Sequence, residues 1–267
     1  MLFSFGYIYV FYQNTGDFIY KDISLTGGTS LTIYDDIDSN KIKSDLSGKL
    51  EEMNTREIYD IITREKIALV IETKTLGNET KQVLEDYLGY GLNDKNSSFE
   101  FTGSLLSESF YKQLLTAIFF AFVFMGIVIF LIFRKTIPAF AVIISAFADI
   151  FMTLVVVDLL GIKISSVGIV AFLMLIGYSV DTDILLTNIV LKSSEGLLNE
   201  KIFKAFKTGM TMTLTSVVAV FIALIISNSF SVVLSQIFTI LLIGLFFDIF
   251  NTWITNVSLI KWYVTGK

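Results

Sequence analysis

The chain has two hydrophobicity patterns, one in each half. The second half consists of long apolar segments separated by short polar ones. Each segment is close to or longer than the ~20 residues that a helix needs to cross the hydrocarbon core of a bilayer. The pattern predicts membrane-spanning helices at residues 114–133, 137–160, 164–191, 210–227 and 232–260.

A shorter apolar stretch, residues 2–12, opens the sequence. It has about half the length of a membrane span. It lacks a basic segment and a small-residue cleavage site, so we do not expect a signal peptide. We interpret residues 1–12 as the remnant of a first transmembrane helix, which predicts six helices in the intact protein.

Between these apolar parts, residues 13–111 alternate between strand and helix signals. Runs rich in β-branched residues predict strands, and apolar residues four apart predict helices. The order strand, helix, strand, strand, helix, strand is that of a ferredoxin-like α+β domain. The strands are expected at 29–35, 56–63, 66–75 and 97–106, and the helices at 39–54 and 78–91.

Composition supports a polytopic α-helical membrane protein that carries this α+β domain. The chain is 54% hydrophobic with a mean hydropathy of +0.70. It contains no cysteine and no histidine, which excludes disulfides, thiol chemistry and histidine metal ligands. We therefore expect no metal and no cofactor, and nothing in the charge pattern suggests binding to nucleic acid.

Lysine and arginine are distributed unevenly among the connections between the predicted spans. Eight lie on one side of the membrane and two on the other. By the positive-inside rule, the richer side faces the cytoplasm. This predicts a multi-pass protein of the cytoplasmic membrane, in contact with its lipids, with residues 13–111 extracytoplasmic and residues 112–267 forming a five-helix transmembrane domain. The outer part is acidic, with 18 acidic and 10 basic residues in 13–111.

Four aspartates lie well inside the predicted spans: Asp149, Asp181, Asp183 and Asp248, whereas Asp158 lies near the end of one span, where we expect it to be interfacial. A carboxylate at the bilayer centre costs about 2.5–3.5 kcal/mol on insertion scales, so such residues usually mark an ion or proton path. They could instead hold helices together through hydrogen bonds. Residues two apart point to opposite sides of a helix, so we expect Asp181 and Asp183 to lie on separate faces.

Each of these two aspartates has its own polar stripe. Asp183 aligns with Ser179 and Thr187, and Asp181 aligns with Gly177 and Asn188. We expect Gly177 to let a neighbouring helix approach closely beside the aspartates. Similar stripes contain Ser145, Asp149 and Thr153 in one span, and Gly244, Asp248, Asn251, Thr252 and Thr255 in another.

Three segments resemble the SecD/SecF family of export membrane proteins, and its SecF branch in particular. They are ISLTGGTSLTIY (23–34), which includes Gly27, Gly28 and Thr29; residues 101–135; and IGYSVDTDILLTN (176–188), which includes Gly177 and Tyr178. The Asp-Thr-Asp form is similar to the archaeal version. Gly27 and Gly28 are expected to form a turn that tolerates positive φ.

The resemblance implies a protein that is not an enzyme. It implies a SecD partner, a SecYEG-type translocon and unfolded secretory polypeptides as clients. Thr211 stands where bacterial relatives carry an arginine in the fifth helix, so the resemblance leaves proton coupling by this chain alone open. Asp149, Asp181, Asp183, Asp248 and Thr211 are the candidates for a proton or ion path or for the SecD interface.

Two other classes are compatible with parts of the pattern. One is a small-molecule or ion transporter of the RND-like superfamily, whose members usually have two six-helix halves. The other is an intramembrane aspartyl protease, with Asp149 and Asp181 on neighbouring helices. That chemistry requires two facing carboxyl groups, and GYSVD lacks the expected Gly-x-Gly-Asp block.

Overall fold

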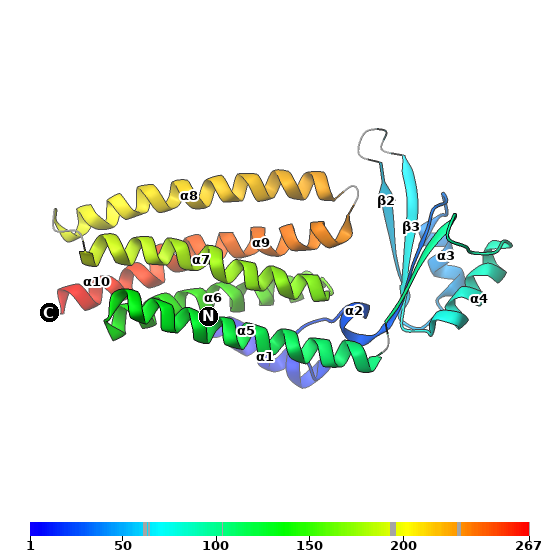
Figure 1. Cartoon of the computed structure of the whole chain (residues 1–267), viewed down its shortest axis with the longest axis horizontal. Coiled ribbons are helices and arrows are strands. Elements are labelled where there is room, and N and C mark those ends of the chain that lie inside the picture. The colour runs from blue at the N-terminus through cyan, green and yellow to red at the C-terminus, as the bar shows by residue number, and fades with distance from the viewer. Residues whose placement is uncertain (61–62, 64, 103, 193–195, 229–230, 267) are drawn as a thin grey trace.

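The computed structural model describes the chain apart from residues 61–62, 64, 103, 193–195, 229–230 and 267. It consists of a bundle of long helices with a small sheet domain at one end (Figure 1). This arrangement confirms the predicted class, a polytopic helical membrane protein with an α+β domain.

The sheet has four strands in the described part of the chain, in the order β2-β3-β1-β4. Every neighbouring pair is antiparallel. Together with the intervening helices, this is the ferredoxin-like topology that the sequence predicts. The strands are β1 (Gly28–Ile33), β2 (Asn54–Tyr59), β3 (Lys66–Thr73) and β4 (Ser97–Thr102).

Helices α3 (Ser39–Leu46) and α4 (Gly77–Leu88) cover the face of the sheet that is turned away from the bundle (Figure 1). Alternate residues of a strand point to one face, and those of β1 and β3 fill the core beneath the two helices. The fully buried side chains there are Leu31, Ile33, Ile42, Leu46, Leu69, Ile71 and Leu84.

Several predicted element ends in this domain are wrong. The strand expected to reach residue 63 ends at Tyr59, and the helix expected to reach residue 91 ends at Leu88. The helix expected to reach residue 54 ends at Leu46, although Leu50 is buried as its spacing indicates. The strand expected to reach residue 106 ends at Thr102, because α5 begins at Ser104. Residues 61, 62 and 64 of the predicted turn between β2 and β3 lie outside the described part.

Five helical segments of the described chain are long and apolar enough to cross a membrane, as predicted. Several of these helices are longer than the predicted apolar segments, because a helix can continue past the hydrocarbon core into polar residues. The segments are α5 (Ser104–Phe133), α6 (Thr136–Leu159), α7 (Ser166–Lys192), α8 (Leu198–Ser227), and the continuous run of α9 (Val232–Phe250), the π-helix η1 (Asn251–Asn256) and α10 (Val257–Thr265).

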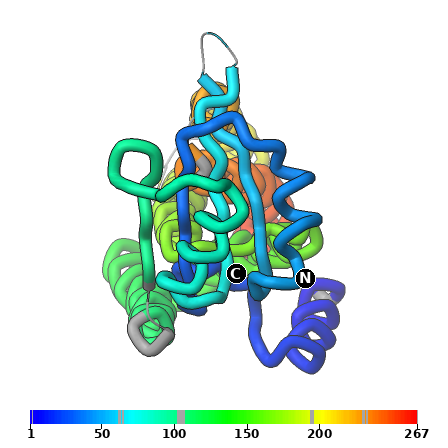
Figure 2. Tube along the Cα trace, turned by 90° about the vertical axis from the view of Figure 1, so that its right-hand side faces the viewer, coloured from blue at the N-terminus to red at the C-terminus, as the bar shows by residue number. Residues whose placement is uncertain are grey.

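The central helices of the bundle are α6, α7 and α9. In the most apolar 18-residue stretch of α6, and likewise of α7, half of the residues are buried inside the bundle. In α5 the corresponding share is 6%. α5 therefore presents most of its surface outward. α1 (Leu2–Thr15) lies on a different flank from α5 (Figure 2).

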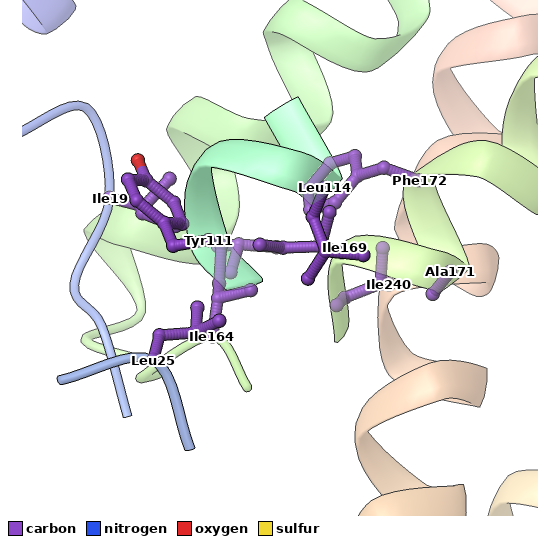
Figure 3. Packing of buried hydrophobic residues seen from close by; sticks show 10 residues of the cluster. Ile19, Leu25, Tyr111, Leu114, Ile164, Ile169, Ala171, Phe172 and Ile240 are labelled. Atoms are coloured by element: carbon purple, nitrogen blue, oxygen red, sulfur yellow. The ribbon is translucent and has the colours of Figure 1, made fainter. Parts of the chain in front are cut away.

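The sheet domain is joined to the outer end of the bundle, the end next to the sheet, by both backbone and side chains. The Ile164 amide donates to the Tyr20 carbonyl at 2.6 Å, and the Asp22 amide donates to the Ile164 carbonyl at 3.0 Å. The short helix α2 (Ile23–Thr26), which the sequence does not predict, follows directly. Apolar residues from four separate parts of the chain pack around this joint (Figure 3): Ile19, Leu25, Tyr111, Leu114, Ile164, Ile169, Ala171, Phe172 and Ile240.

Candidate functional site

Asp149, in the middle of α6, is completely buried in the bundle. Both of its carboxylate oxygens accept a hydrogen bond from another helix. Ser179 of α7 donates its hydroxyl to Oδ2 at 2.5 Å, and Asn251 of η1 donates its amide to Oδ1 at 2.6 Å. The side chain thus links three helical elements.

Asp183 lies on the inward face of α7 and is also fully buried. Its Oδ1 accepts two hydrogen bonds from η1, one from the Thr252 hydroxyl at 2.9 Å and one from the Asn256 amide at 2.6 Å. Its Oδ2 has no partner within the described residues. The inward stripe of Ser179, Asp183 and Thr187 that the spacing predicts is confirmed, because all three are buried.

Asp248, near the end of α9, is the third fully buried aspartate in this part of the bundle. Its closest partner is Thr252 one turn further along, whose hydroxyl lies 3.2 Å from Oδ1. Thr182 of α7 lies 3.5 Å from Oδ2, at the limit of hydrogen bonding. In the described part of the chain, no lysine or arginine forms an ion pair with Asp149, Asp183 or Asp248.

The π-helix η1 brings these contacts together. It interrupts the α-helical pattern between α9 and α10 for six residues. Three of its side chains, Asn251, Thr252 and Asn256, are the ones that bond to the aspartates. Short π segments inside α-helices occur frequently at functional sites. Sequence reasoning places Asn251 and Thr252 on the correct face but misses both the π-helix and Asn256.

Asp181 does not belong to this buried group. It is exposed on the outer face of α7, together with Gly177, Tyr178 and Asn188. The prediction that Asp181 and Asp183 lie on separate faces is confirmed. The expectation for Gly177 is wrong within this chain, because a Cβ built there would meet no atom within 4 Å. The arrangement also contradicts an aspartyl protease site built from Asp149 and Asp181, because Asp149 is buried and Asp181 points outward, so their carboxyl groups do not face each other.

Thr211, on α8, is also separate from the three buried aspartates. It is exposed, and its hydroxyl donates to the Lys207 carbonyl of its own helix at 2.8 Å. The close helix contacts are made at other glycines. A Cβ at Gly244 would lie 2.3 Å from Leu175, and one at Gly209 would lie 2.5 Å from Trp253. Of the five predicted site residues, the structure therefore brings together Asp149, Asp183 and Asp248.

Comparison with known proteins identifies the family of this chain. The model of the family described as protein export membrane protein SecD/SecF, C-terminal, matches residues 83–266. The protein-export membrane protein SecF of Methanocaldococcus jannaschii is 40% identical over 253 residues, which cover 92% of this chain and 87% of the relative. The chain belongs to the SecD/SecF family.

Solved structures show the same fold. The crystal structure of SecDF, a translocon-associated membrane protein from Thermus thermophilus, matches with a TM-score of 0.71 at 17% identity. The match covers 99% of this SecD/SecF family chain and 36% of the SecDF chain. A heavy metal efflux pump matches with a TM-score of 0.52 at 9% identity over 89% of this chain, which shows a related fold alone.

The glycine motif of this SecD/SecF family member lies where the chain enters the sheet. Gly27 has a φ of 83° and Gly28 a φ of 150°, as expected for residues that leave α2 in a turn. A Cβ at Gly28 would lie 2.5 Å from the Thr73 carbonyl oxygen, so β3 could not approach β1 as closely. The Thr29 hydroxyl donates to the Thr75 carbonyl at 2.8 Å. All three motif residues thus shape the sheet domain.

A polar cleft separates the open face of the sheet from the outer end of the bundle. Its volume is about 580 Å³, and Asp22, Arg56, Glu72, Lys163 and Gln236 are among the residues that line it. Burial raises the pKa of the Asp22 carboxyl, and burial together with the neighbouring Asp22 charge raises the pKa of Glu72. No local pattern in the sequence predicts this cleft, because its walls come from segments far apart in the chain.

Proposed function

We propose that this protein is an accessory subunit of the Sec protein-export machinery. In this role it works with a SecD-type partner beside a SecYEG-type channel and helps unfolded secretory polypeptides to leave the membrane on the outer side. The observation that carries the proposal is the 40% identity to a SecF protein over 92% of the chain. The fold match to SecDF, a translocon-associated protein, supports it.

The proposed orientation places the sheet domain outside the cytoplasm. α5, α7 and α10 all end on the side of the bundle opposite the sheet domain (Figure 1). Arg134, Lys192 and Lys261 lie at or next to these ends. Positively charged residues at one end of a bundle favour the cytoplasmic side for that end.

We further propose that the outer face of α7 binds the SecD-type partner. Asp181 is exposed on a helix that crosses the membrane, and within the described residues it has neither a hydrogen bond nor an ion pair. A carboxylate facing lipid costs about 2.5–3.5 kcal/mol on insertion scales. A partner helix that supplies a hydrogen-bond donor or a positive charge would remove this cost. Thr211 and its exposed neighbours on α8 offer further polar contacts.

The buried aspartates have a different role from that of Asp181. Asp149, Asp183 and Asp248 link α6, α7 and the α9–η1 segment. α7 and α9 also reach the joint with the sheet domain through Ile169 and Ile240. We propose that a change in the charge of these carboxyl groups shifts the helices and thereby the sheet domain. The role is conformational rather than catalytic.

The test is export in cells that depend on this protein, with Asp→Asn variants at positions 181 and 183. Asparagine keeps the shape of aspartate and part of its hydrogen bonding but cannot carry the charge. Asp183→Asn should slow secretion while the membrane level and the co-purification of the SecD-type partner stay unchanged. Asp181→Asn should retain the partner, since an amide still forms hydrogen bonds. Asp181→Leu should lose it.

Thr153→Val is the matched control in the bundle, because among the described residues the Thr153 hydroxyl bonds only to the carbonyl of Asp149 in its own helix, at 2.6 Å. It should export at the wild-type rate. Normal secretion by Asp183→Asn would exclude a role for its charge. Purification from native membranes without any SecD-type partner would exclude the proposed subunit role.

A further inference from the structure

Three tripeptides of the form Asn-x-Ser/Thr occur in the chain. They begin at Asn78, Asn96 and Asn256, and none has proline in the middle position. This is the acceptor sequence for N-linked glycosylation on the outer side of a membrane. The motif is short and also occurs by chance, so the surroundings of each asparagine decide whether it can be modified. The reacting group is the side-chain amide nitrogen, which has to be accessible and free of other bonds.

Two of the three asparagines use their amide nitrogen inside the protein. Asn256 is completely buried in the bundle, where its amide nitrogen donates to Asp183 at 2.6 Å. Asn96 lies in the loop before β4. Its amide nitrogen donates to the Gly91 carbonyl at 3.0 Å, and its Oδ1 accepts from the Asn93 amide at 2.8 Å. A sugar on either nitrogen would disrupt these bonds, so the structure disfavours both positions.

Asn78 differs from both of them. It is the second residue of α4, its side chain is exposed, and it forms no hydrogen bond with any described residue. It does not serve as a helix cap either, since the capping position is Leu76. Figure 1 shows α4 at the end of the sheet domain that is farthest from the bundle. A sugar chain at this position would extend into water without displacing any contact of the fold.

The hydroxyl of this motif belongs to Thr80, which is fully buried and donates to the Thr75 carbonyl at 3.1 Å. The motif therefore has to be modified before the domain closes, and the order of synthesis allows this. The start of α4 packs against β4, because a Cβ at Gly77 would lie 3.0 Å from Phe99. Since β4 is made after α4, residues 78–80 lack this cover until β4 pairs with β1.

Distance along the chain separates the two outer motifs further. The start of α5, Ser104, comes 26 residues after Asn78 but only 8 residues after Asn96. At about 3.5 Å per residue, an extended chain places Asn78 up to ~90 Å and Asn96 up to ~28 Å from the start of α5. An enzyme whose active site stands above the membrane surface therefore reaches Asn78 more readily.

We propose that Asn78 carries an N-linked glycan. The donor is an oligosaccharide joined through a phosphate ester to a membrane lipid, and a membrane-bound oligosaccharyltransferase carries out the transfer. The Asn78 amide nitrogen attacks the anomeric carbon of the first sugar. A bond forms between this nitrogen and the carbon, and the bond from the carbon to the phosphate oxygen breaks. The lipid phosphate leaves with the electron pair, and the amide gives one proton to a carboxylate of the transferase.

This modification rests on the proposed external position of the sheet domain and is independent of the export role. Another enzyme attaches the glycan, so a protein that is correctly oriented but inactive in export would still carry it. The glycan would cover part of the face formed by α3 and α4 with a bulky hydrated chain. The polar cleft and the outer face of α7 would stay open to partners, because they lie elsewhere on the molecule.

Mass spectrometry of tryptic peptides from the protein purified out of its native membrane tests the assignment. Trypsin cuts after lysine, which places Asn78 in the peptide 75–81 and Asn96 in the peptide 96–112. The peptide 75–81 should carry the added mass of a sugar chain, and the peptide 96–112 should have its unmodified mass. Recovery of the peptide 75–81 at its unmodified mass alone would refute the proposal, whatever the activity of the protein in export.

Three variants locate the glycan by gel migration under denaturing conditions. Asn78→Gln keeps an amide at an exposed position but removes the acceptor, so this variant should migrate faster than the wild type, and chemical deglycosylation should abolish the difference. Asn96→Gln is the matched control and should migrate as the wild type does. Thr80→Ser keeps the hydroxyl of the motif and should retain the slower migration. Equal migration of Asn78→Gln and the wild type before deglycosylation would overturn the assignment.

Discussion

At the scale of single residues, one hydroxyl connects two of the buried carboxyl groups. Thr252 lies 2.9 Å from Asp183 and 3.2 Å from Asp248. A hydroxyl has a single proton to donate, so only one of the two carboxyl groups receives it at a time. A change in the charge of Asp183 therefore alters the hydrogen bonding of Asp248 without any movement of the backbone.

The acidic residues of the sheet domain should respond to pH in opposite directions. The Lys66 ammonium, whose Nζ lies 2.6 Å from Glu57, lowers the pKa of the Glu57 carboxyl to about 2. The contribution of the Glu57 carboxylate to folding stability is present above the ordinary pKa of 4.5 and is lost as the pH falls towards 2. The pKa of Glu72 is raised. Its contribution is therefore present below the ordinary value and is lost as the pH rises through the raised one.

We predict that Glu57→Gln reduces the loss of stability at acidic pH, and that Glu72→Gln reduces the loss on raising the pH above 4.5. Thermal unfolding of the full chain as a function of pH, compared with the wild type, measures both. Identical pH profiles for the two variants would contradict the assigned directions.

At the scale of elements, the periodicity of the sequence predicts the existence and type of nearly all helices and strands. The strand and helix order of the sheet domain follows from local patterns, since each element carries its own apolar face. The π-helix has no such local signal, because Asn-Thr-Trp-Ile-Thr-Asn is compatible with an ordinary α-helix. Its hydrogen bonds to Asp149 and Asp183 come from other helices, and a single sequence does not reveal them.

In the candidate site, too, local spacing is predictable from the sequence and contacts between helices are not. The spacing of Ser179, Asp183 and Thr187 predicts a shared face, and the structure confirms it. Which face turns inward depends on the neighbouring helices. Gly177 is an example. Glycine is typical of close helix contacts, but Gly177 faces outward, whereas Gly244 makes the close contact with Leu175.

Substitution of Gly177 and Gly244 should show which of the two glycines makes a close helix contact. Gly244→Ala places a methyl group 2.3 Å from Leu175 and should destabilise the bundle by about 1–3 kcal/mol through overpacking. Gly177→Ala meets nothing within 4 Å and should be neutral or stabilising by about 0.4–1 kcal/mol. Thermal unfolding in detergent compares the two. The added substitution Leu175→Ala should recover part of the loss in Gly244→Ala, and equal stabilities of both single variants would refute the contact.

At the scale of the whole molecule, the two ends of the bundle differ in what they present. One end carries the acidic sheet domain and the polar cleft, and the other carries the basic residues that follow α5 and α7. This difference in charge between the two ends is a property of the single chain. The exposed outer faces of α5 and α7 remain for lipid or for a second subunit.

The orientation can be tested with single cysteines, because the chain has none of its own. Ser98 of β4 and Asn199 of α8 are both exposed, whereas Ser97 is buried and Ser194 lies outside the described residues. A membrane-impermeant reagent on intact cells should label Ser98→Cys and should label Asn199→Cys only after the cells are opened. Labelling of Asn199→Cys in intact cells would reverse the assigned topology.

The joint between Tyr20 and Ile164 has a consequence for the order in which the protein assembles. The strands of the sheet domain pair within residues 28–102, so this domain can fold on its own side of the membrane before the later helices are made. Its seat on the bundle, however, requires Ile164, which is synthesised more than a hundred residues after Tyr20. Contacts between residues so far apart in sequence form slowly. During synthesis the sheet domain therefore passes through a period in which it is folded but not yet seated, connected to the membrane through α1 and α5.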